Sequence, residues 1–129
     1  MQTVENWAGG LVDKPGTYKL SESGQVLRVW IDEGKIVHYE LQDNTGHVIF
    51  ATKERASAFH RWAIFFDGQR GQIWFDSSDI GTSVATKAPD GNYSEIAVAS
   101  DPSLIRAMPQ ELFGRLTSST KGFVSKIYG

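Results

Sequence analysis

Residues 61–76 have the sequence RWAIFFDGQRGQIWFD, in which two runs of aromatic and β-branched residues flank a DGQRG turn. This pattern is typical of a β-hairpin. If Asp67 pairs with Gln72, alternate residues on the two arms share a face, and one face is apolar. The other face carries Arg61, Phe65, Trp74 and Asp76. Because that set is too apolar for a solvated surface and too polar for a core, it is a clue to function.

A second hairpin is predicted from residues 25–31 and 35–41, which flank the turn Asp32-Glu33-Gly34. We expect Gly34 to take the turn position that requires a positive φ angle. Pairing Ile31 with Lys35 gives both strands one apolar face and one face that mixes aromatic and charged residues. The sequence therefore predicts a two-faced sheet around this hairpin.

The mixed face is the candidate binding site. The pairing sets Arg28 opposite His38, and a third strand at residues 47–52 would place Phe50 beside His38. The candidate ligand-binding residues are Arg28, Trp30, His38, Glu40, Phe50 and Trp74. Aromatic rings can hold an apolar group while Arg28 and His38 bind an anionic end. The predicted function is therefore a small non-enzymatic domain that binds a small amphipathic or anionic ligand.

Two alternatives use the same residues. In the structural one, the aromatic rings form a second small core beneath a helix, and Arg28 and Glu40 form a solvated ion pair that contributes little. In the functional one, exposed aromatic residues and a strand edge make a protein interaction or inhibitor domain, which could also self-associate.

The pattern of the whole chain favours an all-β fold. About eight short strands at hairpin spacing predict an antiparallel meander that forms either a barrel or a two-sheet sandwich, in one domain over residues 1–129. A short amphipathic turn is expected before residue 15, and a loop or helical turn at residues 53–60. Asp101-Pro102 predicts the start of a C-terminal helix packed on the sheet. Residues 121–128 alternate enough to be a last strand.

Composition limits the partners. The 129 residues include no cysteine and carry a net charge of -2, so a broad attraction to nucleic acid or acidic membranes is not expected. The N-terminus lacks the apolar run of a signal peptide, which favours a cytoplasmic protein, although a secreted form without its signal peptide would have the same sequence.

Catalytic and metal-binding chemistry is weakly indicated. His38 and Glu40 occupy alternate strand positions, but a third ligand is missing, so no metal or other cofactor is expected. Ser77-Ser78-Asp79 has the composition of a turn rather than of a nucleophile motif. Asp67 and Asp76 are expected to stay ionised in solvent and receive no acid–base role. The sequence thus favours a binding protein over an enzyme.

Overall fold

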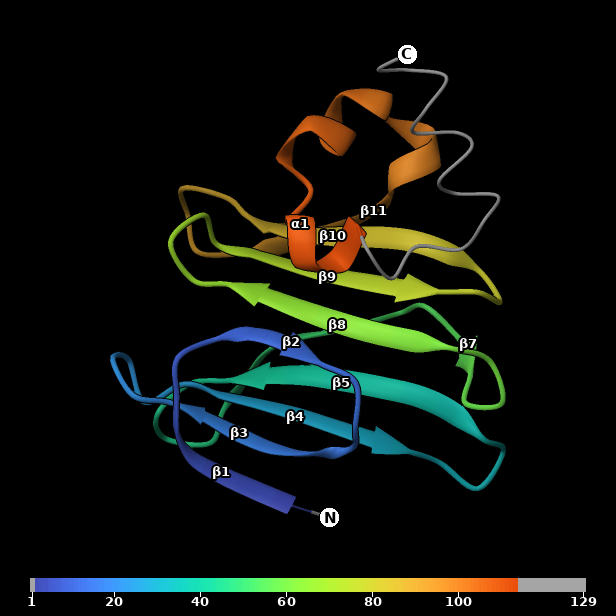
Figure 1. The fold of residues 1–129 in the computed structure, drawn as a ribbon. Helices are drawn as coiled ribbons and strands as arrows, with labels where there is room; N and C mark the ends of the chain where they lie inside the picture. Colours follow the sequence, from blue (N-terminus) through green and yellow to red (C-terminus); the bar gives the residue numbers. More distant parts are fainter. Residues whose placement is uncertain (1, 114–129) are drawn as a thin grey trace.

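The computed structural model describes residues 2–113, which fold into two packed β-sheets (Figure 1). Sheet A has the strand order β1 (Gln2–Trp7), β3 (Gly16–Leu20), β4 (Val26–Ile31), β5 (Ile36–Gln42) and β6 (Val48–Ala51), with β7 (Ala56–Ser57) also paired to β5. Sheet B has the order β11 (Tyr93–Ala97), β10 (Gly81–Lys87), β9 (Gln72–Ser77), β8 (Trp62–Asp67) and β2 (Gly10–Val12). The all-β prediction is confirmed, in the form of a sandwich.

The central hairpin β8–β9 has the predicted register. Asp67 pairs with Gln72, and Phe65 pairs with Trp74. Gly71 closes the turn with a φ of 63°, and a Cβ atom there would lie 2.9 Å from the Cβ of Lys87. Both the backbone angle and the space therefore require glycine at this position.

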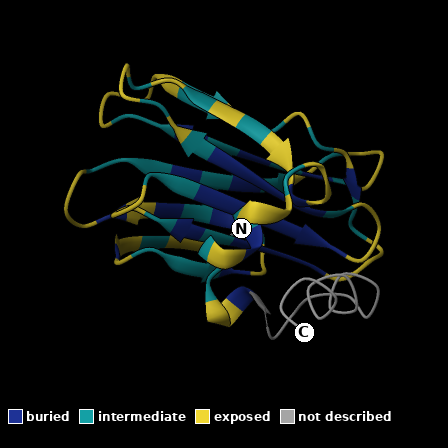
Figure 2. Ribbon diagram, turned by 90° about the horizontal axis from the view of Figure 1, so that it is seen from above, coloured by how far each residue is buried: buried dark blue, intermediate teal, exposed yellow. Residues whose placement is uncertain are grey.

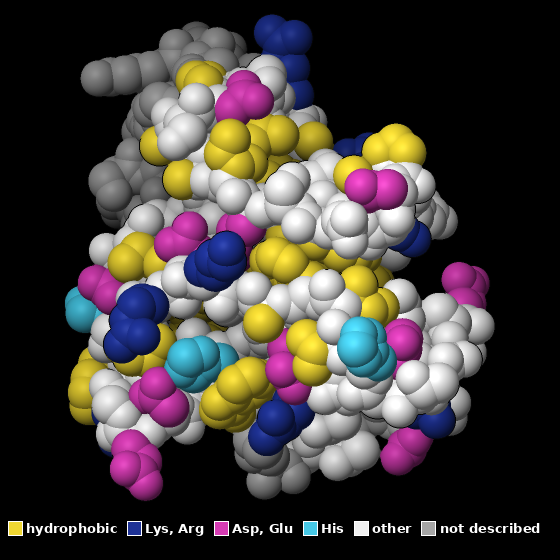
Figure 3. Space-filling view, turned by 180° about the vertical axis from the view of Figure 1, so that it is seen from behind, with side chains coloured by type: hydrophobic (Ala, Val, Ile, Leu, Met, Phe, Trp, Pro, Cys, Tyr) yellow, Lys and Arg dark blue, Asp and Glu magenta, His cyan; other side chains and the backbone are white. Residues whose placement is uncertain are grey.

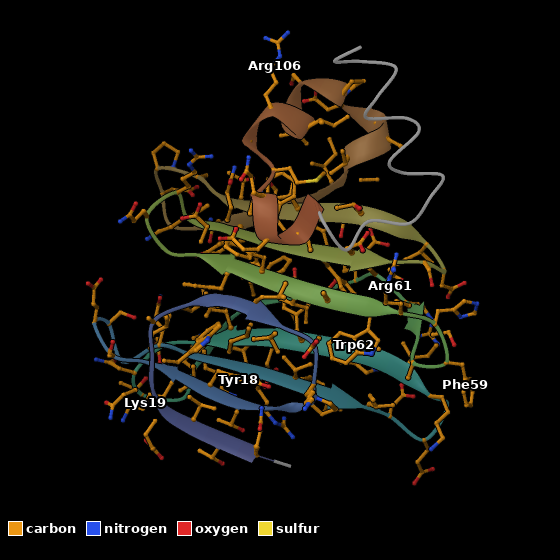
Figure 4. All side chains as sticks on the ribbon, viewed as in Figure 1. Tyr18, Lys19, Phe59, Arg61, Trp62 and Arg106 are labelled. Carbon is orange, nitrogen blue, oxygen red and sulfur yellow. The ribbon has the colours of Figure 1, made fainter. Side chains whose placement is uncertain are left out.

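Apolar side chains from the inner faces of both sheets form the main core. Its fully buried members include Leu27, Val29, Val37, Tyr39, Leu41, Ile64, Ile73 and Phe75. Figure 4 shows Trp62 pointing between the two sheets. Buried residues concentrate in the strands, whereas the loops at the ends of the sandwich are mostly exposed (Figure 2). Removal of this apolar surface from water is the main stabilising contribution.

The C-terminal segment lies on the side of sheet B that faces away from sheet A (Figure 1). It contains two 3₁₀ helices, Val98–Ser100 and Pro102–Ala107, and the short α-helix α1 (Gln110–Phe113). Asp101 caps the second 3₁₀ helix by accepting hydrogen bonds from the backbone N–H and the hydroxyl of Ser103. The predicted helix start is confirmed, and Pro109 interrupts a longer helix because it lacks a backbone N–H. The strand predicted at residues 121–128 lies outside the described residues.

The N-terminal prediction was wrong. Instead of an amphipathic turn, β1 pairs in parallel with β3, and β2 joins the edge of sheet B. Gly9 and Gly10, with φ angles of 91° and 99°, turn the chain from one sheet to the other. Extended pairing with an existing edge satisfies more backbone groups than an isolated helical turn would.

The register predicted for the hairpin of β4 and β5 also needs correction. Ile31 pairs with Val37 rather than with Lys35, a shift of two residues. An even shift leaves each residue on its predicted face. In the β4–β5 turn, Lys35 rather than Gly34 has the positive φ, 63°. The loop between the two strands spans residues 32–35, one residue more than the predicted 32–34.

Candidate functional site

Four of the six candidate residues lie together on the outer face of sheet A. Arg28 pairs with Glu40 across β4 and β5, and Trp30 pairs with His38. The other two candidates lie elsewhere in the sandwich: Phe50 on the inner face of sheet A and Trp74 on the outer face of sheet B. The predicted continuous face of six residues was therefore wrong.

Phe50 changes face because β6 contains an irregularity. Gln42 pairs with Val48, but the neighbouring Leu41 pairs with Phe50, so one extra residue is inserted in β6. A one-residue insertion reverses the faces of the residues that follow. The centre of the Phe50 ring consequently lies 6.0 Å from the centre of the Tyr39 ring and 5.7 Å from that of Tyr93 in sheet B.

Trp74 is fully buried in a second hydrophobic cluster. Its side chain is 0 % exposed and packs with Val84, Val98, Ile105 and Leu112, among others. The C-terminal segment therefore covers the mixed face of the central hairpin. The structural alternative, a second core beneath a helical segment, applies to Trp74.

The remaining residues form a continuous row of contacts, which we call the tryptophan strip: Arg28, Trp30, Asp32, His38 and Glu40. The guanidinium carbon of Arg28 lies 4.6 Å from the centre of the Trp30 ring. The His38 ring stacks on Trp30 at 5.2 Å with an interplanar angle of 14°. Nε2 of His38 donates a hydrogen bond to Oδ2 of Asp32 at 2.7 Å. Asp32 was not among the predicted residues, although its position two residues after Trp30 could have indicated the shared face.

Each end of the strip has a carboxylate bound to a neighbouring side chain: Asp32 to His38 and Glu40 to Arg28. The hydrogen bond from His38, followed by the backbone N–H of Ile36, holds the pKa of Asp32 below its ordinary value. At the other end, Oε1 of Glu40 lies 3.5 Å from Nη1 of Arg28 and also accepts a 2.9 Å hydrogen bond from Gln42. The side chain of Arg28 is 44 % exposed and that of Glu40 only 13 %. The strip therefore presents its cation more openly than the carboxylate beside it.

The view from behind shows acidic, basic, histidine and apolar side chains interleaved over the lower half of the molecule (Figure 3). Among residues 2–113, no group of three or more His, Cys, Asp and Glu side chains could hold a metal ion. Within the same residues, no helix is both long and apolar enough to cross a membrane.

Phe59 is the most exposed large apolar side chain of the described residues, at 81 %. It projects from the loop between β7 and β8 at one end of the sandwich (Figure 4). The backbone N–H of Phe59 donates to Oγ of Ser57, and that of Ala58 donates to the carbonyl of Lys35. Phe59 was not among the candidate ligand-binding residues, because a lone aromatic in a polar loop has no periodic pattern.

No protein-family model matches the chain, and no similar curated protein or solved structure was found. Function therefore has to be inferred from the surfaces that the two sheets create.

The environment of Asp76 differs from the one predicted from the sequence. This residue was expected in solvent but is only 1 % exposed, between its strand partners Ala63 and Thr82 in sheet B. Burial raises the pKa of Asp76, and this effect is opposed by a 2.8 Å hydrogen bond from the hydroxyl of Thr82. A carboxyl group with a raised pKa in the folded state makes the protein less stable when it ionises.

We expect Asp76→Asn to gain stability relative to the natural protein as the pH rises. The native state holds the Asp76 proton more tightly than the unfolded chain does, so stability is lost as the pH rises from the ordinary pKa, 3.8, through the raised value. Asparagine has no such loss, and its amide oxygen can still accept from Thr82. Urea unfolding from about pH 3 to about pH 7 measures the difference. A difference that does not change with pH would contradict this assignment.

Proposed function

We propose that the chain is a non-enzymatic interaction domain whose tryptophan strip binds a protein segment carrying a carboxylate beside an apolar side chain. The observation that supports this most is the ordered stack of Arg28, Trp30 and His38 on an open sheet face. Arginine and tryptophan are the residue types enriched at the energetic centres of protein interfaces. Rings and guanidinium groups already held by one another lose little further freedom on binding.

The stack favours a protein segment over the small ligand predicted from the sequence. Arg28 and His38 both lie against Trp30, so a planar ligand would have to displace one of them to stack there. A chain segment laid across the strip can instead contact the outer edge of Trp30 and leave the stack intact. With Phe50 and Trp74 on other faces, the aromatic sandwich expected for a small ligand is also missing its other rings.

Charge indicates the chemistry of the partner. Arg28 is the more exposed member of its ion pair. Lys19 lies on the adjacent strand β3 with its side chain exposed, but it pairs with Val26, four residues from Trp30. The accessible cation beside Trp30 is therefore Arg28, which favours a partner with a carboxylate next to the apolar group that contacts the ring.

The test is a selection of displayed peptides on the natural protein alone, with no depletion step, followed by binding of the selected peptides to the variants. We expect enrichment of sequences that place Asp or Glu next to a large apolar residue. The selected peptides should bind Trp30→Ala about tenfold more weakly, the effect of losing a central interface residue. Titration calorimetry measures the Kd values.

Phe59→Ala is the matched control, because it removes an aromatic ring that is 81 % exposed without touching the strip. It should leave the Kd unchanged. Equal binding by Trp30→Ala, or a loss of binding in Phe59→Ala instead, would reject the strip as the site. Sedimentation of the protein alone addresses self-association: a dimer that Trp30→Ala dissociates would mean that the partner is a second copy.

A further inference from the structure

A cleft of about 550 Å³ opens at the end of the sandwich opposite Phe59. Three turns surround it: the crossing from β1 to β2, the turn between β3 and β4, and the β8–β9 hairpin turn. Phe59 precedes β8 and the cleft lies at the end of that strand, so the two features occupy opposite ends of the molecule. The cleft has the volume of many small-molecule sites.

Buried apolar side chains form one part of the cleft lining. Trp7, Leu20 and Phe66 contribute to its lining and are each less than a tenth exposed. The Trp7 ring contacts Phe66 at 5.6 Å, which joins β1 of sheet A to β8 of sheet B. A Cβ atom on Gly9 would lie 3.2 Å from the carbonyl oxygen of Phe66, whereas one on Gly10 would meet nothing within 4 Å. The crossing therefore packs closely against β8 at Gly9 and leaves open space at Gly10.

The lining carries charge of one sign. It includes two carboxylates, Glu22 and Asp67, together with serine and glutamine side chains, and contains no Lys, Arg or His. Oδ2 of Asp67 lies 3.8 Å from Nε of Arg70, whose side chain is 61 % exposed. That partly neutralised pair leaves Glu22 as the main source of negative charge in the cleft.

We propose that this cleft is a second binding site, separate from the tryptophan strip, and that it takes a small organic cation with an apolar body. The apolar part would lie against Leu20, Trp7 and Phe66, which line the cleft. The ammonium group would lie at the rim, where Glu22 and Asp67 attract it and the aromatic rings favour a cation further. An anionic ligand of the same shape would be repelled by Glu22, whereas Asp67 is partly neutralised by Arg70.

Amide NMR spectra of the isotope-labelled chain test this site with three probes of similar shape. Phenethylammonium is the cation, 3-phenylpropionate the anion and 2-phenylethanol the neutral analogue. We expect the cation to shift the amide signals of Gly9, Gly10 and Gly68, and the other two probes to shift them far less. Glu22→Gln should raise the Kd of phenethylammonium roughly fivefold, which is the effect of losing one exposed charge pair.

Glu33→Gln is the matched control, since Glu33 is exposed in the β4–β5 loop and does not line the cleft. It should leave the affinity for phenethylammonium unchanged. Ser21→Trp, on an exposed turn, should fill the cleft and abolish the shifts. Equal binding of all three probes, shifts confined to other residues, or equal effects of Glu22→Gln and Glu33→Gln would each overturn the proposal.

Discussion

Trp74→Ala lowers the free energy of unfolding by about 3–5 kcal/mol, the range for removing a large buried aromatic side chain. Trp74 is 0 % exposed, and its cross-strand partners are Phe65 and Val84. Ile105 of the C-terminal segment belongs to the same cluster. Truncation would therefore leave a cavity between sheet B and that segment.

Urea unfolding of the natural protein, Trp74→Ala and Trp74→Phe measures this effect. Trp74→Phe should cost clearly less than Trp74→Ala, because an aromatic ring still fills most of the space. A cost of less than about 1 kcal/mol for Trp74→Ala would mean that the C-terminal segment does not cover this ring in solution. The same result would make Trp74 a candidate binding residue again.

Phe50→Ala is expected to lower the free energy of unfolding by about 2 kcal/mol, below the range for a fully buried Phe because the side chain is half-buried. Its ring bridges the sandwich through Tyr39 of sheet A and Tyr93 of sheet B. The loss should appear as a lower urea midpoint with an unchanged dependence on urea concentration.

Val48→Ala is the matched control on the same strand, since Val48 lies on the other side of the irregularity in β6 and is 43 % exposed. It should change the free energy of unfolding by less than about 0.5 kcal/mol. If Phe50→Ala instead left stability unchanged and weakened peptide binding, Phe50 would belong to the tryptophan strip as the sequence had suggested.

The parts of the fold that the sequence predicted well depend on local patterns. The β8–β9 register followed from two alternating runs around a glycine-containing turn. On β4 and β5 the alternation placed Arg28, Trp30, His38 and Glu40 on one face, even though the pairing was shifted. Period-two alternation specifies the face of a residue more firmly than its partner, because an even shift preserves faces.

The parts that could not be predicted depend on irregular or distant contacts. The extra residue in β6 has no sequence signal, yet it moved Phe50 into the core. The covering of Trp74 requires residues about thirty positions later in the chain to fold back on sheet B. The cleft likewise combines three turns that are separated in sequence. For these reasons the sequence predicted the shared face of four candidate residues on sheet A and misplaced Phe50 and Trp74.

The most direct test of the tryptophan strip measures two quantities on one variant, Trp30→Ala: the free energy of unfolding and the Kd of a selected acidic peptide. Trp30 lies on an open sheet face and outside both buried clusters. We expect stability to fall by no more than about 1 kcal/mol while the Kd rises about tenfold. A marked loss of stability with an unchanged Kd would contradict the account, because it would make the strip a packing feature of sheet A rather than a binding surface.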